Sequence, residues 1–301
     1  MHRADSGKRF EHIVFPREEK RRLAINLAPT QPSSMPSHEI CQATWTPEEM
    51  RFVTWLLAKV DIDVRHYRAE TLQRRLPACL RTVRATSPEN AQEMLEQNPA
   101  AIPLAISALL VGVTSFFRDP LVFDQLQVEV ERFALEGKTG LNVWSIGCSE
   151  GAELYSLAMI VAENQLLHES CLLGTDCRTD AIEHARKGIY ENAALRHVPV
   201  AFCDRYFERN DKCSRISSFI RQFVRWRVSS ILGECEPGLW DIIFFRNTAL
   251  YLRPDVVVEI WAKLENALRP GGLLVLGRAE RPNGVHRMRA IGPCVYRRYH
   301  R

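Results

Sequence analysis

The sequence has 301 residues, of which 46% are hydrophobic and 25% charged, a composition that excludes collagen, coiled coils and wholly disordered chains. Lys and Arg number 40 against 36 Asp and Glu, and a net charge of +4 is too small to indicate nucleic-acid binding by itself. No apolar run reaches the ~18 residues that span a bilayer, and no signal peptide is evident, so we expect a cytoplasmic protein without membrane insertion. The nine cysteines form no CxxC pair, so we expect reduced thiols and no metal site.

The first third of the chain contains an expected leader followed by helices. Residues 1–43 combine basic clusters with a Pro/Ser run, which predicts a flexible leader. Thr46-Pro47-Glu48-Glu49 then places a capping residue before a proline and two acids, which predicts a helix start. Helical spacing of apolar residues continues to about residue 112. We therefore expect a helical N-terminal domain and its linker over 44–125.

Arginines are frequent around the second predicted helix, at 69–83. Two interpretations stay open: a solvated face, or a positive surface that docks an acidic partner. Under the second interpretation Arg74 and Arg75 are the candidate docking residues, on a surface separate from the ligand pocket. The arginines of this region are Arg65, Arg68, Arg74, Arg75, Arg81 and Arg84.

From about residue 140 the pattern changes to short apolar runs that alternate with amphipathic helices. This alternation is typical of a parallel, doubly wound α/β sheet, which we expect over 126–301. Two late runs are expected to pair antiparallel at one edge, and the alternation at 219–228 suggests a small antiparallel insertion near 204–228. The expected strands are 141–146, 171–175, 240–245, 272–276, 285–290 and 294–299, and the expected helices are 152–164, 180–188 and 254–268.

A glycine-containing loop follows the first expected strand. In Gly147-Cys148-Ser149-Glu150-Gly151 the glycines allow a ligand to approach the backbone, beside the free N–H groups of a helix start. A dinucleotide is disfavoured because the middle glycine is missing and acids stand nearby. The same residues spell the G-x-S-x-G of serine hydrolases, but that elbow follows several strands rather than a helical region.

A sulfonium cofactor, S-adenosylmethionine, is the third interpretation of this loop. It has no phosphate for the nearby acids to repel, and its ammonium group suits them. Asp176 ends the second expected strand, where a carboxylate could accept hydrogen bonds from both ribose hydroxyls. The spacing and the polarity agree with this cofactor.

Several motifs, in this order, resemble the CheR family of chemoreceptor glutamate methyltransferases. The similarity runs from about 45 to 299. Two of the motifs, T-x-F-F-R and R-N-x-x-x-Y, are specific to the family. The motifs are Val113-Thr114-Ser115-Phe116-Phe117-Arg118-Asp119, the stretch 147–156, Ala185-Arg186-Lys187-Gly188-Ile189-Tyr190, Arg205-Tyr206-Phe207 and the stretch 245–252.

The resemblance implies a Rossmann-like class I methyltransferase domain behind a helical domain, with a small β-subdomain inserted before the fourth strand. It also implies roles for individual residues. Arg118 would bind either the methionine carboxylate or the substrate carboxylate, since a guanidinium fork suits both. Expected cofactor contacts are Thr114, Arg118, Gly147, Glu153 at the ammonium, Asp176 at the ribose, Ser230 and Ile231 beside adenine, and Asn247, with Arg118 and Tyr251 as catalytic residues near the transferred methyl.

The implied activity is methyl transfer from S-adenosylmethionine to a receptor glutamate, giving a γ-methyl ester and S-adenosylhomocysteine. A carboxylate is already a nucleophile, so positioning should dominate the rate. We expect a monomer that acts on a chemoreceptor-type protein and not on nucleic acid, because no base-methyltransferase motif follows the fourth strand. Departures from the family at Gly112, Ala152 and Arg278-Ala279 favour an alternative, a catalytically weak module that binds the cofactor or its product in regulation.

Overall fold

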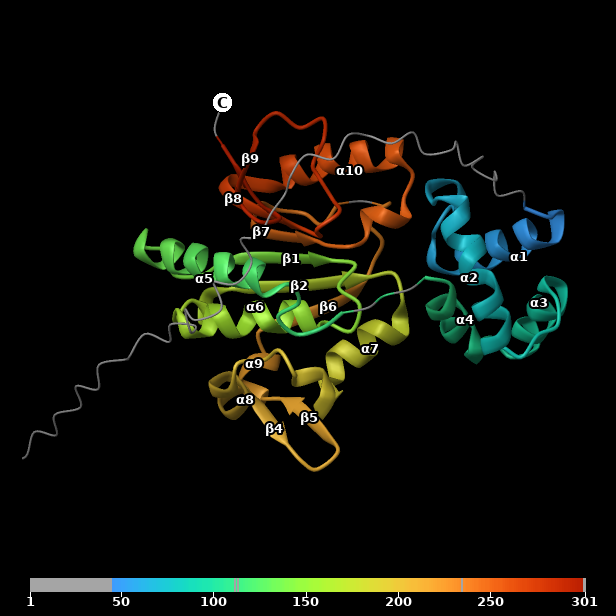
Figure 1. Cartoon of the computed structure of the whole chain (residues 1–301), viewed down its shortest axis with the longest axis horizontal. Helices are drawn as coiled ribbons and strands as arrows, with labels where there is room; N and C mark the ends of the chain where they lie inside the picture. Colours follow the sequence, from blue (N-terminus) through green and yellow to red (C-terminus); the bar gives the residue numbers. More distant parts are fainter. Residues whose placement is uncertain (1–44, 111, 113, 234, 300–301) are drawn as a thin grey trace, which may run out of the picture. The chain divides into compact units, whose positions relative to one another are not determined.

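A computed structural model describes residues 45–110, 112, 114–233 and 235–299 of the chain (Figure 1). The predicted leader at 1–43 lies outside these residues. The first described helix, α1 (Pro47–Leu57), begins as its sequence predicts, because the Thr46 hydroxyl accepts a hydrogen bond from the Glu49 N–H at 3.2 Å. The Glu49 carboxylate accepts from the Thr46 N–H at 3.1 Å, which completes a capping box.

Four helices form the N-terminal part, and their apolar faces make one core. Phe52, Leu56, Leu72 and Ile106 are almost completely buried in it. Three of the six arginines expected on the second helix, Arg65, Arg68 and Arg84, lie outside it, because that helix begins at Ala69 and ends at Thr82. The elements are α1, η2 (Ala58–Val60), η3 (Val64–His66), α2 (Ala69–Thr82), α3 (Pro88–Gln97), η4 (Pro99–Ala101) and α4 (Ile102–Leu109).

The expected doubly wound sheet is present, with seven strands in the order β6-β2-β1-β7-β8-β10-β9. The first five of these strands are mutually parallel, and the late pair β10 and β9 is antiparallel at one edge, as predicted. In chain order the strands are β1 (Asn142–Ile146), β2 (Cys171–Asp176), β6 (Val224–Val228), β7 (Trp240–Phe245), β8 (Leu268–Leu276), β9 (Met288–Gly292) and β10 (Val295–Arg298).

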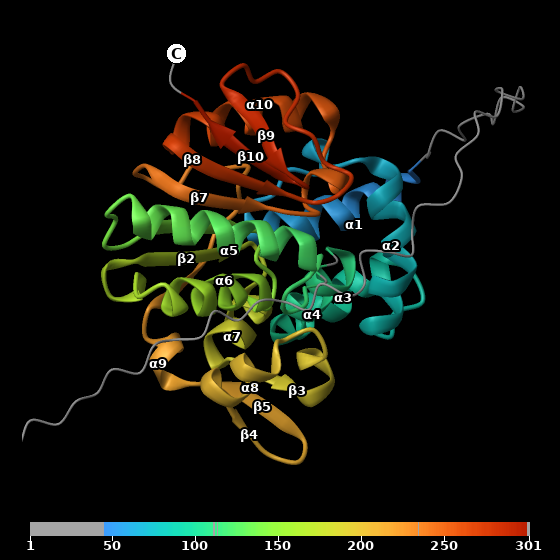
Figure 2. The same ribbon diagram turned by 60° about the vertical axis from the view of Figure 1, so that its left-hand side comes forward.

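Helices cover both faces of this sheet (Figure 2). Ile242 and Phe244 of β7 pack into the core shared with α5 (Pro120–Leu135) and α6 (Ala152–Glu163), whereas Ile243 and Phe245 join the core under α10 (Pro254–Ala267). Alternate residues of a strand point to opposite faces, so a strand buried on both faces is apolar throughout. Helix α7 (Thr179–Lys187) contacts β2 and β6.

A second, smaller sheet has the order β3-β5-β4 and is antiparallel. It lies between α7 and β6, so the insertion precedes the third parallel strand and not the fourth. The elements between β1 and β7 not yet given are η5 (Leu167–Glu169), β3 (Ile189–Glu191), η6 (Asn192–Leu195), α8 (Val200–Tyr206), β4 (Phe207–Arg209), β5 (Cys213–Ile216) and α9 (Ser218–Arg221).

The expectation that 219–228 forms strands of the insertion is wrong. Ser218–Arg221 is the short helix α9, and Val224–Val228 is the edge strand β6 of the large sheet. Val224 pairs with Leu172 of β2 in parallel register. An alternating pattern marks any strand with one buried face and cannot tell which sheet the strand joins.

Candidate functional site

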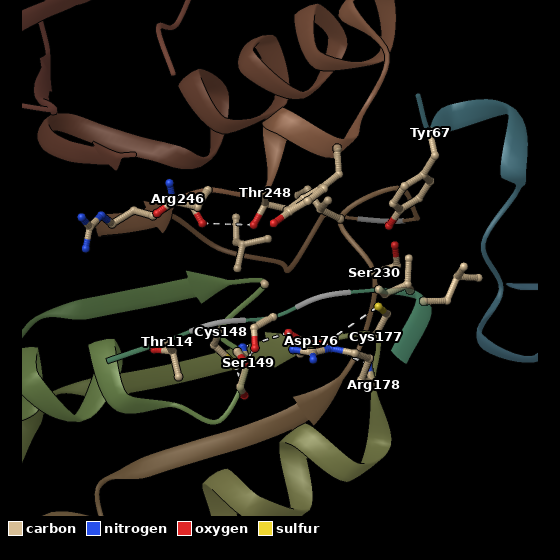
Figure 3. Close-up of a pocket in the computed structure, with 18 of the residues that line it drawn as sticks. Tyr67, Thr114, Cys148, Ser149, Asp176, Cys177, Arg178, Ser230, Arg246 and Thr248 are labelled. Atoms are coloured by element: carbon tan, nitrogen blue, oxygen red, sulfur yellow. Dashed lines mark hydrogen bonds and ion pairs between the residues drawn. The ribbon is translucent and has the colours of Figure 1, made fainter. Parts of the chain in front are cut away.

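A cavity of about 390 Å³ opens at the carboxyl ends of β1, β2 and β7 (Figure 3). Ligands of doubly wound proteins bind at this edge of the sheet. The helical part supplies another wall, with Tyr67, Thr71 and Arg75. Nine residues expected as cofactor contacts or catalytic residues line the cavity: Thr114, Arg118, Gly147, Glu153, Asp176, Ser230, Ile231, Asn247 and Tyr251.

The two candidate docking arginines differ in position. Arg74 is exposed and is not among the residues that line the cavity, whereas Arg75, the next residue of α2, is half-buried and lines it. The expectation that both belong to a surface separate from the pocket is therefore wrong for Arg75. Successive helical residues point about 100° apart, so two neighbours on α2 can serve different surfaces.

The loop after β1 brings the backbone close to the cavity. Gly147 has φ +61°, and a Cβ at this position would lie 2.6 Å from Thr248 Oγ1. A side chain here would meet both steric conflict and a strained backbone. The loop 147–151 therefore requires glycine at position 147, directly after β1, and Gly147 lines the cavity.

Asp176 lies at the cavity, but both of its carboxylate oxygens are already engaged. Oδ1 accepts from the backbone N–H and the Nε–H of Arg178, each at 3.0 Å. Oδ2 accepts from the Ser149 N–H at 2.8 Å and from Nη2 of Arg178 at 3.2 Å. A carboxylate offers about four lone-pair sites, so Asp176 is not the free acceptor for two hydroxyls that its sequence position suggested.

Glu153 is likewise paired, with an arginine to which the sequence analysis assigned no role. Arg246, only 5% exposed, forms ion pairs with Glu153 and, at 2.5 Å, with Asp119. It also donates to the carbonyls of Leu276 and Arg118, at 3.2 and 3.1 Å. Burial raises the pKa of Glu153, while Arg246 and Arg118 favour its ionised form. The sequence did contain a signal for this role, because Arg246 is a charged residue directly after the apolar strand β7.

The loop after β7 is held by Glu280, a second residue without an assigned role. Its carboxylate accepts backbone N–H bonds from Gly277, Asn247 and Ala249 at 2.7, 2.8 and 2.9 Å. Burial raises the pKa of Glu280, against the effect of these hydrogen bonds. The anchored loop places Asn247, with φ +57°, at the cavity.

Two polar atoms at the cavity are buried without hydrogen-bond partners among the described residues, Thr114 Oγ1 and Asn247 Oδ1. An unsatisfied buried polar atom costs about 1–3 kcal/mol. Both residues are expected cofactor contacts, and a polar ligand that bonds them would relieve this cost.

The chain segment before α2 is tied to the segment after β7 by backbone hydrogen bonds. Tyr67 and Leu252 form an antiparallel bridge. The Arg68 N–H donates to the Tyr251 carbonyl at 2.9 Å, and the Arg253 N–H donates to the His66 carbonyl at 2.9 Å. This junction fixes the helical wall of the cavity beside Tyr251.

Two of the three departures from the family pattern make contacts of their own. A Cβ at Gly112 would lie 2.0 Å from Nη2 of Arg178, so the guanidinium fills the space beside this glycine. Arg278 forms an ion pair with Asp119 at 2.6 Å, on the carboxylate that also binds Arg246. Ala152 is buried at the start of α6, and nothing in the structure explains its replacement of an acid.

The described residues contain neither a metal-binding cluster nor a membrane-spanning helix. No group of three or more His, Cys, Asp or Glu side chains is placed to hold a metal ion. None of the helices in the described ranges is both long and apolar enough to cross a membrane.

The fold is a doubly wound α/β sheet, and its cavity lies at the carboxyl edge, where ligands of such folds bind. The family model described as "CheR methyltransferase, SAM binding domain" matches residues 112–292, more than half of the chain. The chain therefore belongs to the CheR methyltransferase family.

Named relatives agree with this assignment. The probable biofilm formation methyltransferase WspC of Pseudomonas putida is 30% identical over 238 residues, 77% of this chain and 56% of that protein. Chemotaxis protein methyltransferase 2 of Pseudomonas aeruginosa is 28% identical over 245 residues, 78% of this chain and 87% of that protein. The chemotaxis protein methyltransferase of Vibrio parahaemolyticus is 29% identical over 189 residues, 60% of this chain and 69% of that protein. The chain thus spans about half the length of WspC and more of the two others.

Proposed function

We propose that this protein transfers a methyl group from S-adenosylmethionine to a glutamate side chain of a chemoreceptor-type protein, forming a γ-methyl ester. One observation carries the proposal: the cavity is lined by residues of the matched domain, such as Asn247, and by Arg75 of the arginine-rich helix. The relatives named as chemotaxis methyltransferases support the receptor as the substrate. We propose that the protein acts as a monomer.

The residues at the cavity fit this cofactor. Thr114 Oγ1 and Asn247 Oδ1 are available as hydrogen-bonding atoms, and Gly147 leaves the backbone open. When bound, the cofactor supplies a methyl group on a positively charged sulfur. The residues that would hold it are Thr114, Arg118, Gly147, Glu153, Ser230, Ile231 and Asn247, while Asp176 lies at the expected ribose position with its carboxylate engaged by Arg178.

The protein's part in the reaction is to place an ionised carboxylate in line with the methyl group. Arg118 lines the cavity, and its fork would hold either the cofactor carboxylate or the incoming glutamate. Arg246 forms an ion pair with Glu153 and so holds its carboxylate in one orientation. Tyr251 lines the cavity beside the helical wall and would contact the reacting groups. Because the nucleophile is already ionised, alignment contributes most of the rate acceleration.

Transfer of labelled methyl from S-adenosylmethionine to purified chemoreceptor signalling domains tests the proposal. We expect label that alkali releases as methanol, because carboxyl esters hydrolyse in base and N-methyl groups do not. Glutamate-to-alanine variants of the receptor domain should lose the label. Label that resists alkali, or that the receptor variants retain, would contradict glutamate esterification.

A regulatory module that binds the cofactor or S-adenosylhomocysteine without turnover is the second candidate. The engagement of Asp176 by Arg178 favours it, because a contact expected of the family is changed. Calorimetry with both nucleosides separates the two functions. Binding of either nucleoside, with no transfer to any receptor domain tested, would support the module.

A further inference from the structure

Arg178 is a buried cation in the wall of the cavity, 7% exposed, and no role was expected for it. It follows β2 by two residues and reaches back over the carboxylate of Asp176 (Figure 3). Its guanidinium lies where a side chain at position 112 would otherwise extend, since a Cβ there would be 2.0 Å from Nη2 and 2.6 Å from Cζ. Gly112 and Arg178 are therefore complementary in shape.

The hydrogen bonds of this pair decide which group can meet a ligand. Five hydrogen bonds reach Asp176, three from Arg178, one from Ser149 and a long one from the Cys177 thiol at 3.9 Å, and they use all the lone-pair sites of the carboxylate. The guanidinium has five N–H donors and gives two of them to Asp176. The other three have no hydrogen-bond partner among the residues that the structure describes. This part of the cavity wall thus offers donors rather than acceptors.

Displacement of Arg178 by a ligand would separate a buried, bidentate ion pair. Both side chains are less than a tenth exposed, and breaking a buried pair is strongly unfavourable. The pair should therefore persist when the cavity is filled, and the ligand should adapt to it.

We propose that Arg178 is a specificity-determining residue at the ribose end of the cavity. Its guanidinium makes this end a hydrogen-bond donor, so the cavity can bind an adenine nucleoside whose ribose carries a negatively charged group. The inference rests on the proposed cofactor site, since the acid that ends the second strand of such folds marks the ribose. A free Asp176 would instead require hydroxyl protons from the ribose and would repel a phosphate placed there.

Calorimetry with adenosine, adenosine 2′-phosphate and adenosine 3′-phosphate tests this. In the parent protein we expect at least one phosphate to bind as tightly as adenosine or tighter. Arg178→Met exposes the Asp176 carboxylate, so both phosphates should bind at least about tenfold more weakly than adenosine. A tenfold change in affinity is the size expected for the loss of one charge-assisted hydrogen bond. Arg186→Met removes an exposed arginine of α7 and is the matched control, with parental ratios expected.

A second variant covers the case in which Arg178→Met does not fold. Gly112→Ala places a methyl group against the guanidinium while leaving Asp176 unchanged, and should lower the ratio of phosphate to adenosine affinity several-fold. Weaker binding of both phosphates than of adenosine by the parent would overturn the proposal, as would an unchanged ratio in the variants. Failure of the parent to bind S-adenosylmethionine and S-adenosylhomocysteine would instead overturn the proposed function.

Discussion

The carboxylate of Glu280 accepts the backbone N–H of Asn247 at 2.8 Å, so the loop after β8 holds the loop after β7. The same carboxylate also binds the N–H groups of Gly277 and Ala249. A single buried acid thus sets the position of a cavity residue whose own backbone lies in the left-handed region.

Replacing Glu280 should loosen this loop. Glu280→Ala leaves three N–H groups without their acceptor, and we expect the free energy of unfolding to fall by about 3 kcal/mol, roughly 1 kcal/mol for each lost bond. Glu280→Gln keeps one carbonyl acceptor in the same shape and should lose less. Urea unfolding followed by circular dichroism measures both. Equal urea midpoints for the parent and the alanine variant would mean that the Glu280 carboxylate does not stabilise the loop.

Asp176→Ala should affect stability through the arginine that it leaves behind. An unpaired buried Arg178 is expected to cost about 3–5 kcal/mol of stability. The double variant Asp176→Ala/Arg178→Met removes both charges and should recover most of this loss. Denaturant midpoints of the two single variants and the double variant give the coupling energy. A double variant no more stable than Asp176→Ala would contradict a coupled pair.

Tyr251→Phe should separate catalysis from binding. If the hydroxyl acts beside the transferred methyl, its loss lowers kcat and leaves the Kd for S-adenosylhomocysteine nearly unchanged. Single-turnover transfer and calorimetry provide the two quantities. Equal rates in variant and parent would leave Tyr251 as a wall residue only.

Reversing the charge of Arg74 and of Arg75 separately should give different results. Arg74→Glu should slow methylation of a protein substrate at low salt and less at high salt, because exposed charges are screened over ~8 Å at physiological ionic strength. Arg75→Glu should weaken methylation at every salt concentration and also change cofactor affinity, because Arg75 lines the cavity. Initial rates from 20 to 500 mM salt (~25-fold range) compare them. Identical salt dependence of the two variants would refute this division.

Cys177 gives a prediction about pH. Burial raises the pKa of this thiol to about 12, so the reactive thiolate is scarce at neutral pH. Its alkylation by iodoacetamide should accelerate about tenfold for each pH unit between about 7 and 9, and S-adenosylhomocysteine should slow it because Cys177 lines the cavity. Peptide mass spectrometry follows the label, with Cys213 of β5 as the control outside the cavity. A rate that levels off near pH 8.5 would contradict the raised pKa.

Local signals carried most of the fold prediction. The Thr46 cap, the glycine at 147 and the apolar runs of the parallel strands each determine structure within a few residues, and each appears where it was expected. The placement of 224–228 was missed because strand pairing joins segments distant in sequence, here β6 with β2.

The candidate site was predicted as a set of residues but not as a set of contacts. Nine of the expected cofactor and catalytic residues line one cavity, because family motifs identify positions. The partners of Asp176 and Glu153 depend on where the long arginine side chains reach, and Arg246 and Arg178 could lie in many orientations on sequence grounds alone. Gly112 was judged a lost contact, whereas its missing side chain leaves room for a guanidinium.

The backbone bridge between Tyr67 and Leu252 has a consequence for the proposed protein substrate. It joins the segment that leads into α2 to the one that carries Tyr251, so the proposed docking surface and the cavity keep a constant separation. Successive turns of a helix are 5.4 Å apart. If the protein methylates a receptor glutamate as proposed, this fixed separation selects the glutamate by its distance from the docking surface, and a partner shifted by one turn would present a different residue to the cavity.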